Sequence, residues 1–105
     1  MMKESDLSKA IVENFKKKGG FAITKEFLDS QITSVKYFVI EGTTVTICHM
    51  MLDNGFSVRG ESACISAVNF DEEIGQRIAY KNAYDKLWAL YGFAEMEIAY
   101  RFGED

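Results

Sequence analysis

The residues best suited to catalysis are one histidine, His49, and two cysteines, Cys48 and Cys64. Histidine-based metal sites and proton relays need further ligands or partners, so a single histidine gives them little to work with. A cysteine becomes a nucleophile beside a base or in an electropositive site, but Cys48 and His49 are neighbours on a predicted strand and point to opposite faces. We therefore expect no catalytic residue, and we interpret His49 as a core or boundary side chain.

Acidic residues and glycines offer two further candidate sites. Asp71, Glu72 and Glu73 form a run that resembles a metal-binding cluster, but negative charge here also suits the first turn of a helix. The glycines match neither the G-x-x-x-x-G-K-[ST] nor the G-x-G-x-x-G spacing of phosphate-binding loops. The sequence therefore predicts no metal site and no cofactor.

Two groups of side chains suit binding better than catalysis. A basic cluster either contacts phosphates or ends a helix in solvent; its members are Lys16, Lys17 and Lys18. An aromatic stripe runs along a predicted helix; its members are Tyr80, Tyr84, Trp88 and Tyr91. The stripe either belongs to the core, covered by an N-terminal helix, or forms a protein interface, where Tyr and Trp are enriched.

The composition indicates a single folded domain over residues 1–105, with 48% hydrophobic and 13% aromatic residues. No stretch approaches the roughly 20 apolar residues of a membrane-spanning helix, and no signal peptide is visible, so we expect a cytoplasmic protein. The net charge of −4 disfavours a general nucleic-acid binder. Two cysteines are too few for a disulfide framework.

Two short helices are expected before the sheet. Residues 5–18 carry an apolar stripe of Leu7, Ile11 and Phe15, and the glycines at 19–20 end the helix. We place this helix, within residues 1–20, at the periphery of the domain. A second short helix is predicted from Lys25 to Gln31, beginning after Thr24.

Three strands are predicted next, over 36–40, 43–52 and 56–65. Asn54-Gly55 predicts a two-residue hairpin turn, because both residues tolerate positive φ angles. The resulting register puts one set of side chains on the core face: Val45, Ile47, His49, Met51, Phe56, Val58, Gly60, Ser62 and Cys64. It also puts Cys48 and Cys64 on opposite faces, where they cannot form a disulfide.

A long helix is the clearest predicted element. Asn69 is its expected N-cap, Glu72 completes a capping box, and the helix runs to about Tyr91, with Gly92 ending it. One stripe should lie on the sheet; it consists of Ala79, Ala83, Leu87 and Leu90.

The remaining residues, 94–105, alternate between apolar and other side chains, which is typical of a strand. The predicted order is therefore α-α-β-β-β-α-β. The expected fold is α+β, an antiparallel sheet of three to four strands packed against one long helix. A terminal strand of this kind can also pair with a second copy, which would give a homodimer.

The stretch from 42 to 93 carries the residues of a known family. They are Gly42-Thr43-Thr44-Val45-Thr46-Ile47-Cys48, residues 54–64, residues 69–75, Ala79, Ala83, Lys86-Leu87-Trp88, Leu90 and Gly92. In spacing and order this stretch resembles the small phage protein family named after gene 49 of phage N4 and gene 66 of phage Sf6. The resemblance implies phage or prophage origin and an accessory role, and it implies no particular activity.

We therefore expect a phage accessory protein that is not an enzyme and that binds a host or phage protein, inhibiting a host defence or replication factor. The alternative is a nucleic-acid-binding module that uses the basic cluster. The α-β-β-β-α order is similar to that of a double-stranded RNA-binding domain. However, acidic residues at 71–73 stand where that family has phosphate-binding lysines.

Overall fold

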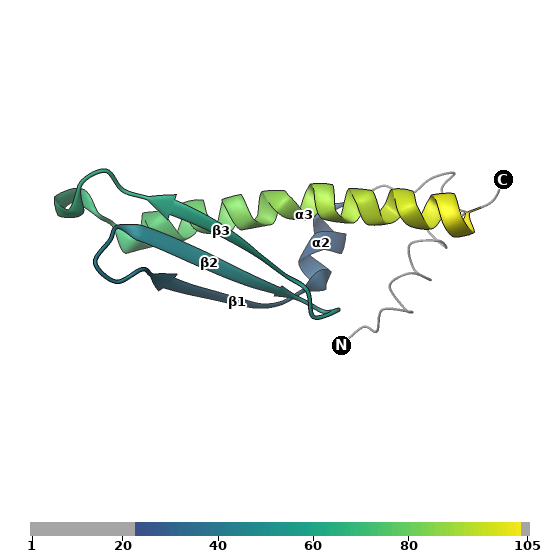
Figure 1. The fold of residues 1–105 in the computed structure, drawn as a ribbon, viewed down its shortest axis with the longest axis horizontal. Helices are drawn as coiled ribbons and strands as arrows, with labels where there is room; N and C mark the ends of the chain where they lie inside the picture. The colour runs from purple at the N-terminus through teal and green to yellow at the C-terminus, as the bar shows by residue number, and fades with distance from the viewer. Residues whose placement is uncertain (1–22, 104–105) are drawn as a thin grey trace.

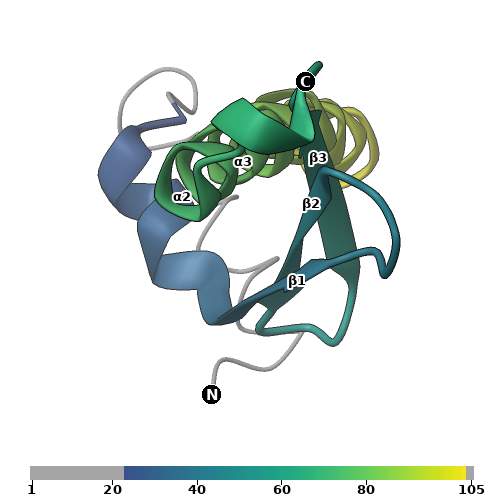
Figure 2. The ribbon, with the colours of Figure 1, turned by 90° about the vertical axis from the view of Figure 1, so that its left-hand side faces the viewer.

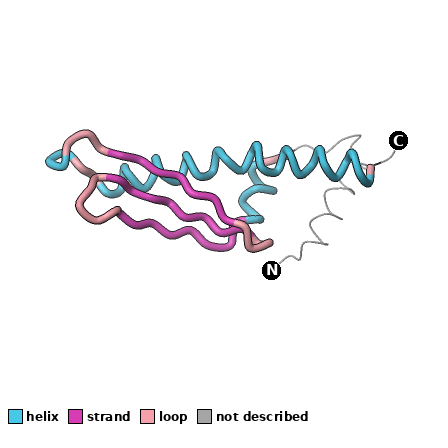
Figure 3. Tube along the Cα trace, viewed as in Figure 1, coloured by secondary structure: helices cyan, strands magenta, loops and turns pink. Residues whose placement is uncertain are grey.

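The computed structural model describes residues 23–103. These residues form an α+β fold with a three-stranded antiparallel sheet in the order β1-β2-β3 and a long C-terminal helix (Figures 1 and 3). The elements are α2 (Lys25–Gln31), β1 (Ile32–Val39), β2 (Val45–Leu52), β3 (Ser57–Ala63), the 3-10 helix η1 (Ala67–Asn69) and α3 (Glu72–Phe102). The predicted α+β class is confirmed. The predicted helix over 5–18 lies outside the described residues.

Helix α2 forms over the predicted residues. The Thr24 hydroxyl accepts a hydrogen bond of 3.1 Å from the Phe27 backbone N–H, which satisfies one of the free donors of the first turn. The chain passes from α2 directly into β1, with no intervening loop. Strand β1 therefore begins four residues earlier than the sequence predicted.

The hairpin between β2 and β3 has a three-residue loop, so the predicted two-residue turn is wrong. The Gly55 N–H donates to the Leu52 carbonyl at 3.0 Å, and the Leu52 N–H donates to the Phe56 carbonyl at 2.8 Å. A two-residue type I′ turn needs positive φ at both central residues. Of the two turn residues, Gly55 alone has positive φ, at 93°.

The longer loop shifts the pairing of β2 with β3 by one residue. Met50 pairs with Val58, and Cys48 pairs with Gly60. A one-residue shift reverses the faces of a strand. The core side chains of β2 are therefore Thr46, Cys48, Met50 and Leu52, and the predicted core placement of Val45, Ile47, His49 and Met51 is wrong.

The cysteines are both free, as predicted, but the predicted reason is wrong. In the observed register Cys48 pairs with Gly60, and Cys64 lies four residues further along the chain. An even spacing puts the two cysteines on the same side of the sheet. At about 3.4 Å per residue along a strand, the distance between them is too long for a disulfide.

Helix α3 begins later than predicted. Its N-cap is Asp71, whose carboxylate accepts hydrogen bonds from the backbone N–H groups of Glu73 and Ile74 at 3.0 and 3.2 Å. Asn69 lies before this point, in η1, and is not the cap.

Helix α3 also continues through Gly92 to Phe102, so the predicted C-terminal strand over 94–105 is wrong. A single glycine costs a helix about 1 kcal/mol, and the good helix formers that follow offset this cost. An ion pair of 2.8 Å between Glu97 and Arg101, one turn apart, supports the extension. The helix ends at Gly103, whose N–H donates to the Ala99 carbonyl at 2.9 Å. The proposed homodimer needs a strand in this segment for pairing, whereas residues 94–102 form helix.

Both described helices lie on one face of the sheet (Figure 2). The predicted stripe of α3 packs there: Ala79, Ala83 and Leu87 are fully buried, and Leu90 is partly buried. Among the described residues, the other fully buried apolar side chains include Leu28, Cys48, Met50 and Leu52. At 1.5 Å per residue α3 is about 46 Å long, against about 27 Å for an eight-residue strand, so its C-terminal part extends beyond the sheet (Figure 1).

No helix within residues 23–103 combines the length and apolar character that crossing a membrane requires.

Candidate functional site

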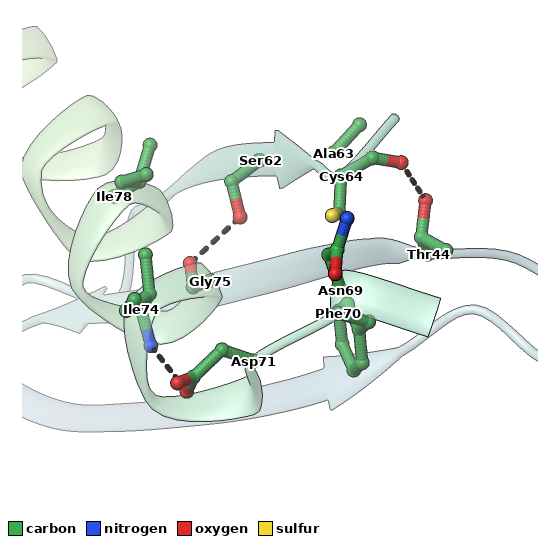
Figure 4. A pocket seen from close by; sticks show the side chains of 10 residues that line it. All are labelled: Thr44, Ser62, Ala63, Cys64, Asn69, Phe70, Asp71, Ile74, Gly75 and Ile78. Atoms are coloured by element: carbon green, nitrogen blue, oxygen red, sulfur yellow. Dashed lines mark hydrogen bonds between the residues drawn. The ribbon is translucent and has the colours of Figure 1, made fainter. Parts of the chain in front are cut away.

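A hollow of about 160 Å³ lies where α3 begins, beside the ends of β2 and β3 (Figure 4). Its lining comes from three places in the chain. The strand side supplies Thr44, Ser62, Ala63 and Cys64, the end of η1 and the turn after it supply Asn69, Phe70 and Asp71, and α3 supplies Ile74, Gly75 and Ile78.

Hydrogen bonds hold the two sides of the hollow together. The Ser62 hydroxyl donates to the Gly75 carbonyl at 2.7 Å, which joins β3 to the first turn of α3. The Thr44 hydroxyl donates to the Cys64 carbonyl and so joins the two strand ends. The Asp71 carboxylate is occupied by the helix N-terminus, as Figure 4 shows for Ile74. The hollow therefore has a fixed frame.

Exposed aliphatic side chains lie in this hollow and in the segment next to it. Ile74 and Ile78 line it from α3 and are 55% and 46% exposed. Ile65 and Val68 lie in the segment that leads from β3 to α3, and they are 106% and 92% exposed. We call these four residues the aliphatic rim. Single exposed aliphatic residues are common, but a group around an apolar hollow marks a binding surface.

The acidic run at the start of α3 serves the helix first. Asp71 caps it, and Glu72 and Glu73 lie exposed in its first turn, where negative charge stabilises the helix dipole. Glu73 also forms an exposed ion pair with Arg77 at 3.4 Å. No group of three or more metal-binding side chains occurs in the part of the chain that the structure describes.

The aromatic stripe is divided between the core and the surface. Tyr84 and Tyr91 are buried, Tyr80 is partly buried, and Trp88 is 42% exposed. Tyr84 stacks on Tyr80 with ring centres 5.8 Å apart and contacts Trp88 edge-on at 6.4 Å. An aromatic interface would therefore present Trp88 and part of Tyr80.

Helix α2 packs against this stripe. The Phe27 ring meets the Tyr91 ring edge-on, with centres 5.6 Å apart. The Tyr84 hydroxyl donates to Asp29 Oδ1 at 2.7 Å. Burial raises the pKa of Tyr84, and the bond to Asp29 adds to the rise. Helix α2 therefore covers part of the stripe. The sequence had assigned this role to the N-terminal helix over 5–18.

The histidine and the thiols do not form a common site. Cys48 is fully buried, and burial raises the pKa of its thiol, which disfavours the reactive thiolate. His49 lies on the opposite face of β2, between Lys36 and Arg59. Cys64 is half-buried in the hollow, and its thiol donates to the Ser66 carbonyl at 3.1 Å.

The sequence interpretation missed the aliphatic rim, although a signal was present. The signal is two branched aliphatic residues close together at the junction of two predicted elements: Ile65 ends the predicted strand over 56–65, and Val68 lies just before the predicted helix. The basic cluster at 16–18, the alternative site, lies outside the described residues.

Comparison with known proteins identifies one relationship. No curated protein and no solved structure matches the chain. Residues 23–98 match the phage protein (N4 Gp49/phage Sf6 gene 66) family. The match spans α2, the whole sheet, the hollow and most of α3. The chain is therefore a member of the phage protein (N4 Gp49/phage Sf6 gene 66) family.

Proposed function

We propose that this phage protein acts by binding another protein, of the host or the phage, through the hollow at the start of α3. The observation that carries the proposal is the aliphatic rim: Ile74 and Ile78 line the hollow and stay exposed, and Ile65 and Val68 are exposed in the segment that joins its lining residues Cys64 and Asn69. Burying such groups against a partner removes apolar surface from water, which is the main driving force of association.

The size of the hollow suits a single anchoring side chain. An apolar cavity of about 150 Å³ can hold a benzene molecule, and the hollow measures about 160 Å³. Protein interfaces obtain much of their affinity from a few anchors that fill such pockets. The partner therefore presents one aliphatic or aromatic side chain to Ile74 and Ile78.

Charge around the hollow restricts the partner further. Asp71 lines it, Glu72 and Glu73 follow in the first turn of α3, and within residues 23–103 Glu73 alone of the three forms an ion pair, with Arg77. Complementary charge steers association and excludes wrong partners. The partner's anchor is accordingly flanked by lysine or arginine.

The proposed role is non-enzymatic, with no cofactor. Cys48 is buried with a raised thiol pKa and is separated from His49 by the sheet. Membership of a phage protein family supports an accessory role in infection, in the host cytoplasm. In this proposal the partner is a host defence or replication factor that the protein blocks.

The experiment is affinity capture from host lysate with matched variants. Ile65→Ser with Val68→Ser removes two exposed rim side chains without opening the core. Phe93→Ser with Met96→Ser removes two exposed apolar side chains of similar size from the far part of α3, where they are 67% and 69% exposed. Capture of a stoichiometric partner should fall at least tenfold with the rim variant and stay unchanged with the control. Capture by the rim variant at the wild-type level contradicts the proposal.

A further inference from the structure

The second face of the sheet is left uncovered by the described helices, because α2 and α3 both pack on the other face (Figure 2). Its side chains form rows across the three strands. One row is Lys36–His49–Arg59, and the next is Phe38–Ile47–Glu61. An open sheet face with basic and aromatic groups is a known type of surface for nucleic acid.

Within residues 23–103, the cations without an ion pair lie on this face or at its β3 edge. Residues 23–103 contain seven lysines and arginines. Four of them pair with a carboxylate one turn away: Lys25, Arg77, Lys81 and Arg101. That leaves three with no carboxylate within ion-pair distance: Lys36, Arg59 and Lys86.

These three residues lie close to one another. Lys36 and Arg59 flank His49 on adjacent strands, so their Cα atoms are about 10 Å apart. The Lys86 ammonium reaches β3 from α3 and donates to the Arg59 carbonyl at 2.6 Å. A second hollow, of about 290 Å³, lies at this edge and is lined by Ile47, Arg59, Gly60, Glu61 and Lys86. The positive charge therefore extends across the sheet, from Lys36 on β1 to Arg59 and Lys86 at the β3 edge.

An exposed aromatic ring lies beside the basic row. Phe38 is two residues from Lys36 on the same face of β1 and is 53% exposed. Aromatic rings on such faces stack on unpaired bases. Glu61 is the one acidic side chain among the strand residues of this face, and it lies in the row of Phe38. The Glu61 carboxylate repels phosphates from that row, so the phosphate backbone of a nucleic acid would lie along the basic row.

We propose that this sheet face is a binding site for single-stranded nucleic acid, with Lys36, Arg59 and Lys86 on phosphates and Phe38 stacked on a base. The protein is acidic overall, so the complementary charge is confined to this face. A duplex hides the faces of its bases from Phe38, which favours an unpaired strand. The site is separate from the protein-binding hollow and from the basic cluster at 16–18.

The test is fluorescence anisotropy with labelled 12-residue oligo(dT), oligo(U) and a DNA duplex of the same length, at increasing salt. The single strands should bind more tightly than the duplex, and the comparison of dT with U shows which sugar is preferred. Replacing Lys36, Arg59 and Lys86 together by Gln should weaken binding roughly tenfold or more. It should also reduce the slope of log K against log salt by about 2, since each phosphate contact on a single strand contributes about 0.7.

Matched control variants distinguish binding at this site from a general effect of the protein's net charge. Replacing Lys25, Lys81 and Arg101 by Gln changes the charge equally and disturbs exposed pairs that contribute little. This control should bind as the wild type does. Phe38→Ser should weaken binding roughly fivefold to a hundredfold, whereas Phe93→Ser on α3 should not.

Three results would overturn this proposal. One is the absence of single-strand binding at low salt. Another is an equal loss of binding in the two triple variants. The third concerns competition with the labelled oligonucleotide. If polyglutamate of equal charge displaces it at the same concentration as unlabelled oligonucleotide does, the face is a site for acidic peptides.

Discussion

Gly60 of β3 lies directly against Ala83 of α3: a Cβ atom on Gly60 would come within 2.8 Å of the Ala83 Cα and would overlap the backbone of Ala79 and Ala83. The two small residues of α3 and the glycine of β3 let the helix backbone rest on the strand. This contact fixes the height of α3 above the sheet, and therefore the position of the hollow at the start of the helix.

The first prediction concerns this contact. Gly60→Ala should lower the free energy of unfolding by about 3 kcal/mol, since overpacking against a rigid backbone typically costs 1–3 kcal/mol and occasionally more. Urea unfolding measures the change. Glu61→Ala, at the next residue and on the open face, is the control and should stay within about 0.5 kcal/mol of wild type. A Gly60→Ala variant as stable as wild type would show that α3 is free to move away from β3.

The second prediction concerns the bond between Tyr84 and Asp29. A hydrogen bond from Lys25 and a second one from Tyr84 lower the pKa of the Asp29 carboxyl. A depressed carboxyl pKa contributes stability above the unfolded pKa of about 4, and this stability is lost as pH falls through the folded pKa. Tyr84→Phe should therefore have a lower Tm than wild type at pH 7, and the difference should narrow below about pH 4.

Thermal unfolding at a series of pH values measures this effect. Tyr80→Phe is the matched control, because Tyr80 stacks on Tyr84 and forms no hydrogen bond with Asp29. A Tm difference for Tyr84→Phe that is the same at pH 7 and pH 3 would mean that the bond to the carboxylate contributes nothing.

The third prediction concerns alkaline pH. The Tyr91 hydroxyl is buried without a hydrogen-bond partner, and burial raises the pKa of Tyr91 to about 12. Its unfolded pKa is about 10, so the folded state holds this proton more tightly and stability falls as pH rises from 10 to 12. Tyr91→Phe should lose less stability over this range. At pH 7 it should be at least as stable as wild type, because a buried hydroxyl without a partner costs free energy.

Urea midpoints at pH 8 and pH 11 measure the alkaline loss. Tyr100→Phe, in the exposed part of α3, should keep the wild-type loss. An identical alkaline loss in Tyr91→Phe and wild type would contradict the prediction.

The fourth prediction concerns thiol reactivity. Cys64 is half-buried in the hollow, whereas Cys48 is fully buried with a raised thiol pKa. Ellman's reagent should therefore modify one thiol per native chain quickly and the second at the rate of unfolding. Cys64→Ser should remove the fast phase, and a bound partner should slow it. Fast modification of Cys48 in native Cys64→Ser would contradict the placement of Cys48 in the core.

Local signals in the sequence predicted the elements well, and the errors came from ambiguous patterns. Thr24 followed by an amphipathic segment specified α2 correctly, because cap and periodicity agree. Asn54-Gly55 fits loops of two or three residues, and the choice decides which face of β2 is buried. Residues 96, 98, 100 and 102 alternate like a strand, yet the pairs 96/100 and 98/102 also have helical spacing.

The candidate sites were harder to predict for related reasons. Alternation in the predicted strand over 56–65 does not tell whether Ile65, its last residue, is covered, and Val68 lies outside the predicted elements. The basic row was concealed by the one-residue shift, because His49 was assigned to the core and its neighbours across the strands were not yet known. The residues of the aromatic stripe lie along α3, but their division between core and surface depends on the position of α2.

Site-specific photo-cross-linking tests the protein-binding proposal most directly. A benzophenone side chain is placed at position 68, in the aliphatic rim, or at position 93, in the far part of α3, and the protein is irradiated in the infected host. Binding through the aliphatic rim predicts one covalent adduct with a single partner from position 68 and none from position 93. Adducts from position 93 alone, or equal adducts from both positions, would contradict it.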